Sequence, residues 1–222
     1  MKPLHCVVIC LLLLLVYYLT SPSYVAMRED GRHWKVLSDY DNSAEAAALL
    51  SRVHAKVMKL MRILRDKYHI DETDDEIADC IGHSAAINAP NDTHNIVKAL
   101  IANYNPDVIY ENDARGTSET SYTTNKGQAM YICLRRKDDP RYLVNEDELL
   151  FVMLHECSHI ANYRGWGHER NFWETFMFVL HEAEIAGLYR PIDYAREPAD
   201  YCGLKIEYNP LLDPTLRKLW VA

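Results

Sequence analysis

Residues 145–173 read NEDELLFVMLHECSHIANYRGWGHERNFW, and the fold that we predict is built around this stretch. Asn145 with Glu148 forms a capping box, which is typical of a helix N-terminus. The mostly apolar run that follows predicts a helix from about Glu146 to Asn162. Polar residues within such a buried helix need a physical reason to be there.

The segment His155-Glu156-Cys157-Ser158-His159 supplies that reason, because it carries the residue types of a zinc site. Residues four apart on an α-helix project from the same face, so the imidazoles of His155 and His159 can converge on one ion. Zinc accepts imidazole nitrogens at about 2.0–2.1 Å in tetrahedral geometry. Zinc lowers the pKa of a water ligand towards about 7. Glu156, one residue along from His155, is then placed to take the proton as the general base.

A catalytic zinc site needs a third protein ligand and one open position, and His168 is the predicted third ligand. Gly165 and Gly167 allow the chain to turn sharply out of the first helix and to bring His168 back. Residues 169–188 then predict a packed C-terminal helix with apolar side chains on one face. A carboxylate from this helix, Glu182 or Glu184, remains open as the alternative third ligand.

The preceding part of the chain predicts a small sheet and two further helices. Asp30-Gly31 predicts a tight hairpin turn between segments 24–28 and 32–37. Asn42 with Glu45 predicts the capped start of a long helix that continues to Lys67. A second helix is expected near residues 94–104, followed by a strand at residues 107–110.

A second hairpin is predicted immediately before the histidine-bearing helix. Its arms are residues 121–124 and 128–134, and Asn125-Lys126-Gly127 has turn chemistry, with Gly127 supplying a positive φ. If Gln128–Leu134 is an edge strand, its free backbone groups could pair with an extended peptide. The alternative, that this strand is internal to the sheet, stays open.

Residues 1–23 are predicted to be a targeting segment separate from the domain of residues 24–222. Leu4 to Leu19 carries no charged residue. As a helix these residues would span roughly 24 Å, a little short of a hydrocarbon core of roughly 30 Å. The segment is therefore either a single-pass membrane anchor or a cleaved signal peptide, and Ser21-Pro22-Ser23 offers small residues for cleavage. The protein is expected at a membrane, in the secretory lumen or in a virion membrane.

Charge and cysteine content narrow the function classes. The formal charge is -8 and no basic run occurs, so nucleic acid is not an expected partner. The cysteines outside the hydrophobic segment form no C-x-x-C pair, so neither a zinc knuckle nor a redox motif is indicated. Cys133 and Cys202 could form a disulfide in an oxidising lumen, but we expect buried free thiols.

The chain resembles a zinc metallopeptidase family of large DNA viruses that infect algae and protists. The resemblance rests on Tyr122 to Gly127, the His155 to His159 motif, Gly167-His168 and Phe172-Trp173, and it extends to Asp30-Gly31-Arg32 and Tyr201-Cys202-Gly203. It covers most of residues 24–212 and implies a zincin fold rather than a particular substrate.

The stretch from His155 to Phe172 is more distantly similar to WLM-type zinc peptidases, in which a third histidine followed by an aromatic residue completes the site. The departure is the gap of eight residues between His159 and His168, which is longer than is typical of WLM proteins. WLM relatives act on proteins attached to DNA, and the acidic charge and the N-terminal segment argue against that role here.

These observations together predict an α+β, zincin-like domain with a small, mostly antiparallel sheet, an active-site helix and a packed C-terminal helix. The tail after Arg190, which contains four prolines, is expected to wrap around the surface. The expected activity is hydrolysis of a protein or peptide substrate with one zinc ion per chain, and Tyr163 and Tyr201 are candidates for stabilising the oxyanion. The alternative is a membrane-attached structural or binding protein that keeps zinc for stability.

Overall fold

The structure is a computed structural model that describes Ile9, Leu12 and residues 23–70, 92–113 and 120–220. The expected targeting segment of residues 1–23 therefore lies outside the described part, apart from Ile9, Leu12 and Ser23. Within the described residues, none of the helices combines the length and the apolar character that crossing a membrane requires.

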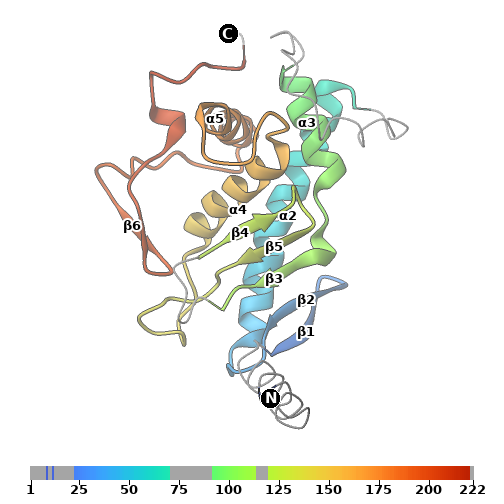
Figure 1. Cartoon of the computed structure of the whole chain (residues 1–222), viewed down its shortest axis with the longest axis vertical. Helices are drawn as coiled ribbons and strands as arrows, with labels where there is room; N and C mark the ends of the chain where they lie inside the picture. The colour runs from blue at the N-terminus through green and yellow to red at the C-terminus, as the bar shows by residue number, and fades with distance from the viewer. Residues whose placement is uncertain (1–8, 10–11, 13–22, 71–91, 114–119, 221–222) are drawn as a thin grey trace.

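Helices and strands are mixed along the chain, as expected for an α+β domain (Figure 1). Each predicted helix and hairpin is present, with boundaries that differ by a few residues. The elements are β1 (Tyr24–Glu29), β2 (Arg32–Leu37), α2 (Ser43–Tyr68), α3 (Asp92–Asn103), η3 (Pro106–Val108), β3 (Ile109–Glu111), β4 (Tyr122–Thr124), β5 (Ala129–Ile132), α4 (Glu146–Ala161), α5 (Arg170–Ile185), β6 (Ala199–Tyr201), β7 (Leu204–Ile206) and η4 (Pro210–Leu212).

The main sheet has five strands in the order β1-β2-β3-β5-β4. The β1–β2 and β4–β5 pairs are antiparallel, whereas β2–β3 and β3–β5 are parallel. Antiparallel residue pairs outnumber parallel ones in this sheet, as predicted, but two of its strand pairs are parallel. The sheet is mixed because α2 and α3 carry the chain back between β2 and β3, and because the β4–β5 hairpin inserts its second strand next to β3.

This order also decides between the two alternatives for the second hairpin. β5 lies between β3 and β4 and is internal, so residues 128–134 do not form an edge strand. Among the described strands, β4 takes that edge instead, and it contacts α4. The first hairpin is as predicted, with Asp30 and Gly31 both at positive φ in its turn.

Helix α2 packs on β1 and β2 and on α3, α4 and α5 (Figure 1). Its start differs from the predicted capping box, because the Asn42 side chain makes no cap hydrogen bond. Asn42 Nδ2 instead donates to the carbonyl of Arg141, and Asn42 Oδ1 accepts from Arg135. The amide side chain is therefore used to hold the loop before α4.

Arg135 also forms a buried ion pair that ties β3 to the segment after β5. Its Nε donates to Glu111 Oε1 at 2.7 Å, and Glu111 Oε2 accepts the backbone N–H of Leu37 at 2.7 Å.

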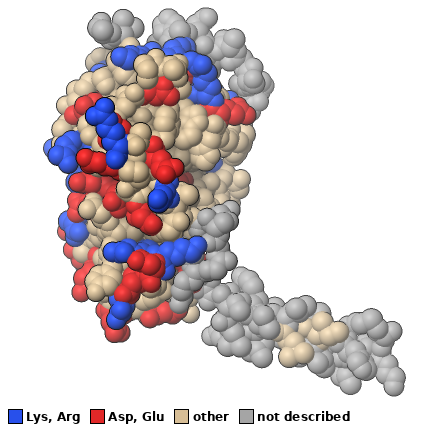
Figure 2. All heavy atoms as spheres, turned by 90° about the vertical axis from the view of Figure 1, so that its left-hand side faces the viewer, with Lys and Arg blue, Asp and Glu red and all other residues tan. Residues whose placement is uncertain are grey.

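Other ion pairs lie on the exposed surface of the protein. Figure 2 shows Lys and Arg close to Asp and Glu on one face, and exposed pairs such as Arg136–Asp138 contribute little to stability.

The segment after Arg190 does more than wrap the surface. It forms the two-stranded β6–β7 sheet, and it buries Tyr194 and Tyr201 in the core. Cys202, directly after β6, is disulfide-bonded to Cys133, directly after β5. The prediction of free thiols at these two positions is therefore wrong. The fold places the two Cα atoms 6.5 Å apart, within reach of a disulfide, although 69 residues separate them in sequence.

Candidate metal centre

Helix α4 carries the first two histidines and is specified by local signals. The Asn145 side chain accepts a hydrogen bond from the backbone N–H of Asp147, so the predicted cap is present. Most side chains of α4 are buried, and the helix lies between α3, α5 and β4. A helix packed on several sides offers a rigid base for His155 and His159.

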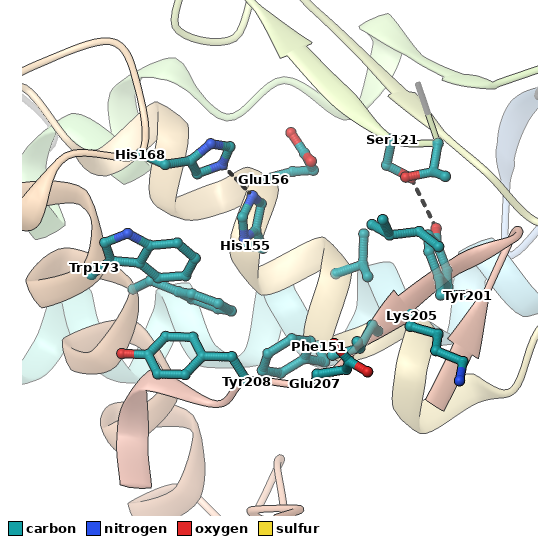
Figure 3. Close-up of a pocket in the computed structure, with 15 residues that line it drawn as sticks. Ser121, Phe151, His155, Glu156, His168, Trp173, Tyr201, Lys205, Glu207 and Tyr208 are labelled. Atoms are coloured by element: carbon teal, nitrogen blue, oxygen red, sulfur yellow. Dashed lines mark hydrogen bonds between the residues drawn. The ribbon is translucent and has the colours of Figure 1, made fainter. Parts of the chain in front are cut away.

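His155, His159 and His168, which we call the histidine triad, meet at their Nε2 atoms. The three Nε2–Nε2 distances are 3.2 Å for His155–His159, 3.1 Å for His159–His168 and 3.0 Å for His155–His168. Figure 3 shows the rings of His155 and His168 turned toward each other, with Glu156 beside them. Among the described residues, this is the group of three ligand-type side chains that could hold a metal ion.

Hydrogen bonding among the rings cannot account for this triangle. A neutral imidazole nitrogen is either a donor or an acceptor. With three nitrogens and two states, at least one pair must be alike, and such a pair repels at about 3 Å. Burial is the largest cause that lowers the pKa of all three rings, and neighbouring histidines add to it at His155 and His159. Together with Lys126 these causes lower the pKa of His159 to about 3. The rings are therefore neutral near pH 7, and three lone pairs can face a single cation.

His168 reaches the triad from the loop between α4 and α5. Its ring stacks on Trp173 and meets Phe172 edge-on, at centroid distances of 5.6 Å and 4.7 Å. Neither Gly165 nor Gly167 has a positive φ, so the loop does not require the left-handed conformations that glycine permits. At Gly165, however, an added Cβ would lie only 3.0 Å from Asn171 Nδ2, so close packing favours glycine there.

The alternative third ligands lie elsewhere. Glu182 is buried, and its carboxylate accepts hydrogen bonds from Lys67 Nζ at 2.7 Å and from the Tyr68 hydroxyl at 3.2 Å. Glu184 is exposed on α5. Neither carboxylate belongs to the histidine cluster.

Glu156 is buried, with 2 % of its surface exposed. Burial raises the pKa of this carboxyl to about 7, although a hydrogen bond from Thr123 opposes the rise. Thr123 Oγ1 donates to Glu156 Oε2 at 2.8 Å, so a residue of β4 fixes the orientation of the carboxylate. Sequence analysis did not single out Thr123, because a threonine in a short strand carries no distinctive signal.

A cavity of about 380 Å³ opens beside the triad, and we call it the site cavity. Its floor includes Phe151, Val152 and Phe176 from α4 and α5. Its outer wall comes from the segment Tyr201 to Tyr208, which includes β7 and the disulfide-bonded Cys202 (Figure 3). The lining is mostly apolar and aromatic, with a smaller number of polar groups that include His155, Glu156 and His168, as in many ligand sites.

The two candidate tyrosines are both engaged in other contacts. The Tyr201 hydroxyl lies at the edge of the cavity, but it donates to the carbonyl of Cys133 at 2.7 Å and contacts Ser121 Oγ at 2.9 Å (Figure 3). The Tyr163 hydroxyl donates to Asp92 Oδ1 at 2.6 Å. These hydrogen bonds give both tyrosines a structural role, because each hydroxyl is engaged with a partner outside the triad.

Comparison with known proteins gives one informative match. The chain is 36% identical over 104 residues to an uncharacterized protein of Acanthamoeba polyphaga mimivirus. The match covers 46% of this chain and 51% of that protein, so the two are compared over about half of their lengths. No protein-family model matches the chain. No solved structure matches it either.

Proposed function

We propose that the protein is a zinc-dependent peptidase of the zincin type. The observation that carries the proposal is the histidine triad, with Nε2 atoms 3.0–3.2 Å apart, next to the buried carboxyl of Glu156. All of these groups lie at one cavity. A similarity to an uncharacterized viral protein is compatible with a viral origin and adds nothing about activity.

The triad fits zinc in ligand type and in size. Zinc favours neutral imidazole nitrogen, and three protein ligands with one open position are the pattern of catalytic rather than structural sites. In a tetrahedral site with Zn–N distances of about 2.0–2.1 Å, the ligand nitrogens lie roughly 3.3–3.4 Å apart. The observed separations are a few tenths of an ångström shorter.

Each group then has a chemical role in amide hydrolysis. Zinc bound at the triad supplies Lewis acidity toward a water molecule and toward the substrate carbonyl. Glu156 accepts the proton from the attacking water and delivers it to the leaving amine. The raised pKa of Glu156 suits a group that must both take and return a proton near neutral pH. Thr123 keeps the carboxylate oriented through its hydrogen bond.

The substrate that suits this site is an extended peptide. Among the described strands β4 is the outer strand of the sheet on the side of Glu156, so the proposal is that a peptide adds there as a further strand. The site cavity would then take one side chain next to the scissile amide. Because Phe151, Val152 and Phe176 form its floor, that side chain is large and apolar.

Digestion of a mixed peptide library tests the function. We expect cleavage next to large apolar residues, on the order of 10- to 100-fold faster than next to Gly or Asp. A chelator stops the cleavage and added zinc restores it, as measured by mass spectrometry of the products. If the protein holds zinc and cleaves nothing in the library, the non-catalytic zinc-stabilised protein becomes the better interpretation.

Metal analysis tests the triad itself. We expect about one zinc ion per chain in the purified protein and a loss of roughly a hundredfold or more in zinc affinity in His168→Ala, because two imidazoles are left. His33→Ala is the matched control, since His33 is exposed on β2, far from the triad in sequence. Equal zinc affinity in the two variants contradicts the proposed ligand set.

The disulfide bears on where the enzyme works. Disulfides are rare in reducing compartments and common in the secretory lumen and on virion surfaces. The Cys133–Cys202 bond therefore supports the proposal that the domain of residues 24–222 lies in such a compartment. The hydrophobic stretch of residues 4–19 would direct it there as a signal peptide or a membrane anchor.

A further inference from the structure

Lys126 lies in the turn of the β4–β5 hairpin, yet its side chain ends at the far end of α4. Its Nζ donates to the carbonyl of Asn162 at 2.6 Å and to that of His159 at 3.2 Å. It also donates to the carbonyl of Gly165. An ammonium group has three hydrogens to donate, and here each has a backbone acceptor.

These three carbonyls belong to the end of α4 and to the loop that follows it. The last carbonyls of a helix have no partner within the helix and carry the negative end of its dipole, so a cation stabilises them. Residues 162–169 contain no helix or strand of their own. Their conformation therefore depends on individual hydrogen bonds, among them Gly165 N–H to the Asn162 carbonyl within the loop and Asn171 Nδ2 to the Arg164 carbonyl from α5. His168 lies in this loop.

The turn that carries Lys126 is itself held in place. Gly127 has a φ of +108°, and a Cβ at this position would lie 2.4 Å from the carbonyl oxygen of Asn103 at the end of α3. The hairpin turn is thus packed directly against α3. Lys126 also lies under the exposed ring of Trp166, with Nζ 4.9 Å from the ring centroid.

We infer that Lys126 is a positioning residue for the third zinc ligand. By joining His159, Asn162 and Gly165 through one ammonium group, it fixes the path of the loop that returns His168 to within 3.1 Å of His159. Thr123 lies three residues earlier on the same hairpin and orients Glu156. One hairpin therefore positions both the general base and the loop-borne ligand. The inference rests on the proposed zinc site.

Zinc affinity of Lys126→Met in the full-length protein tests this role. Methionine keeps much of the apolar stem and removes all three donors. We expect zinc affinity, measured by competition with a chromophoric chelator, to fall roughly 10- to 100-fold. Lys126→Arg keeps a cation with several donors and should recover part of the loss. Lys56→Met is the matched control, because Lys56 pairs with Glu146 at the opposite end of α4 and should leave zinc affinity unchanged.

A double-mutant cycle with His168→Ala separates positioning from general support of the fold. If Lys126 acts through His168, Lys126→Met costs little further zinc affinity once His168 has been removed. Cobalt-substituted Lys126→Met should also show a weaker visible absorption band than the wild type, as its fourfold coordination is lost. Additive losses in the cycle, or unchanged affinity in Lys126→Met, overturn the inference. A wild-type protein that binds no zinc overturns the proposed function together with it.

Discussion

Glu156→Gln is expected to abolish most peptide cleavage while leaving the zinc site and the fold intact. The amide is nearly isosteric with the carboxyl but cannot accept the proton of the attacking water. Loss of a general base typically costs 10²–10⁴-fold in rate, so kcat should fall on the order of 10²–10⁴-fold. The Thr123 hydroxyl can still donate to the amide oxygen, and the histidine triad is unchanged. The measurements are kcat on a library-derived peptide and zinc content per chain.

The control for this prediction is Glu148→Gln. Glu148 lies on the same helix, and glutamine still suits its place in the capping box at Asn145. This variant removes one carboxylate from α4 without touching the triad, so it should cleave at the wild-type rate. Should Glu156→Gln cleave as fast as Glu148→Gln, Glu156 is not the general base. Loss of zinc from Glu156→Gln would instead show that the carboxyl supports the metal site.

The elements that sequence analysis predicts well are those whose signals are local. The cap at Asn145 and the apolar pattern of α4 lie within one segment, and the spacing of His155 and His159 follows from helix geometry alone. The Asp30-Gly31 turn is local in the same sense. The placement of His168 near the other two histidines is as predicted, and Gly165 and Gly167 lie in the loop that returns it, although neither has a positive φ.

The elements that sequence analysis misses depend on contacts between distant segments. The insertion of β5 between β3 and β4 cannot be inferred from the strand patterns, because alternation distinguishes the two faces of a strand and does not tell which strands pair along its edges. Asn42 has the sequence pattern of a cap, but Arg135 and the Arg141 carbonyl compete for its side chain. Lys126 is predicted only as a turn residue, since its acceptors lie 33 to 39 residues further along the chain.

The same reasoning explains why the outer wall of the site cavity was not foreseen. The segment from Tyr201 to Tyr208 is far in sequence from α4, and only the tertiary fold brings it over Phe151 and Val152. Two of its attachments lie close together. The disulfide Cys133–Cys202 and the hydrogen bond from the Tyr201 hydroxyl to the Cys133 carbonyl both join it to the end of β5. The outer wall of the site cavity is therefore held in part by the Cys133–Cys202 disulfide.

Replacing both Cys133 and Cys202 with serine should lower the free energy of unfolding by about 4 kcal/mol, the loop-closure value for a cross-link across 69 residues. The outer wall of the site cavity also becomes less firmly held, so KM for apolar peptides should rise. The fall in kcat should be smaller, because neither the triad nor Glu156 is bonded to the disulfide. Chemical denaturation of the wild type, with and without a reductant, checks the first effect. The reductant should lower wild-type stability and leave the double variant unchanged. A wild type whose stability does not respond to the reductant argues that the two thiols are free in solution, and the proposed oxidising compartment then loses its support.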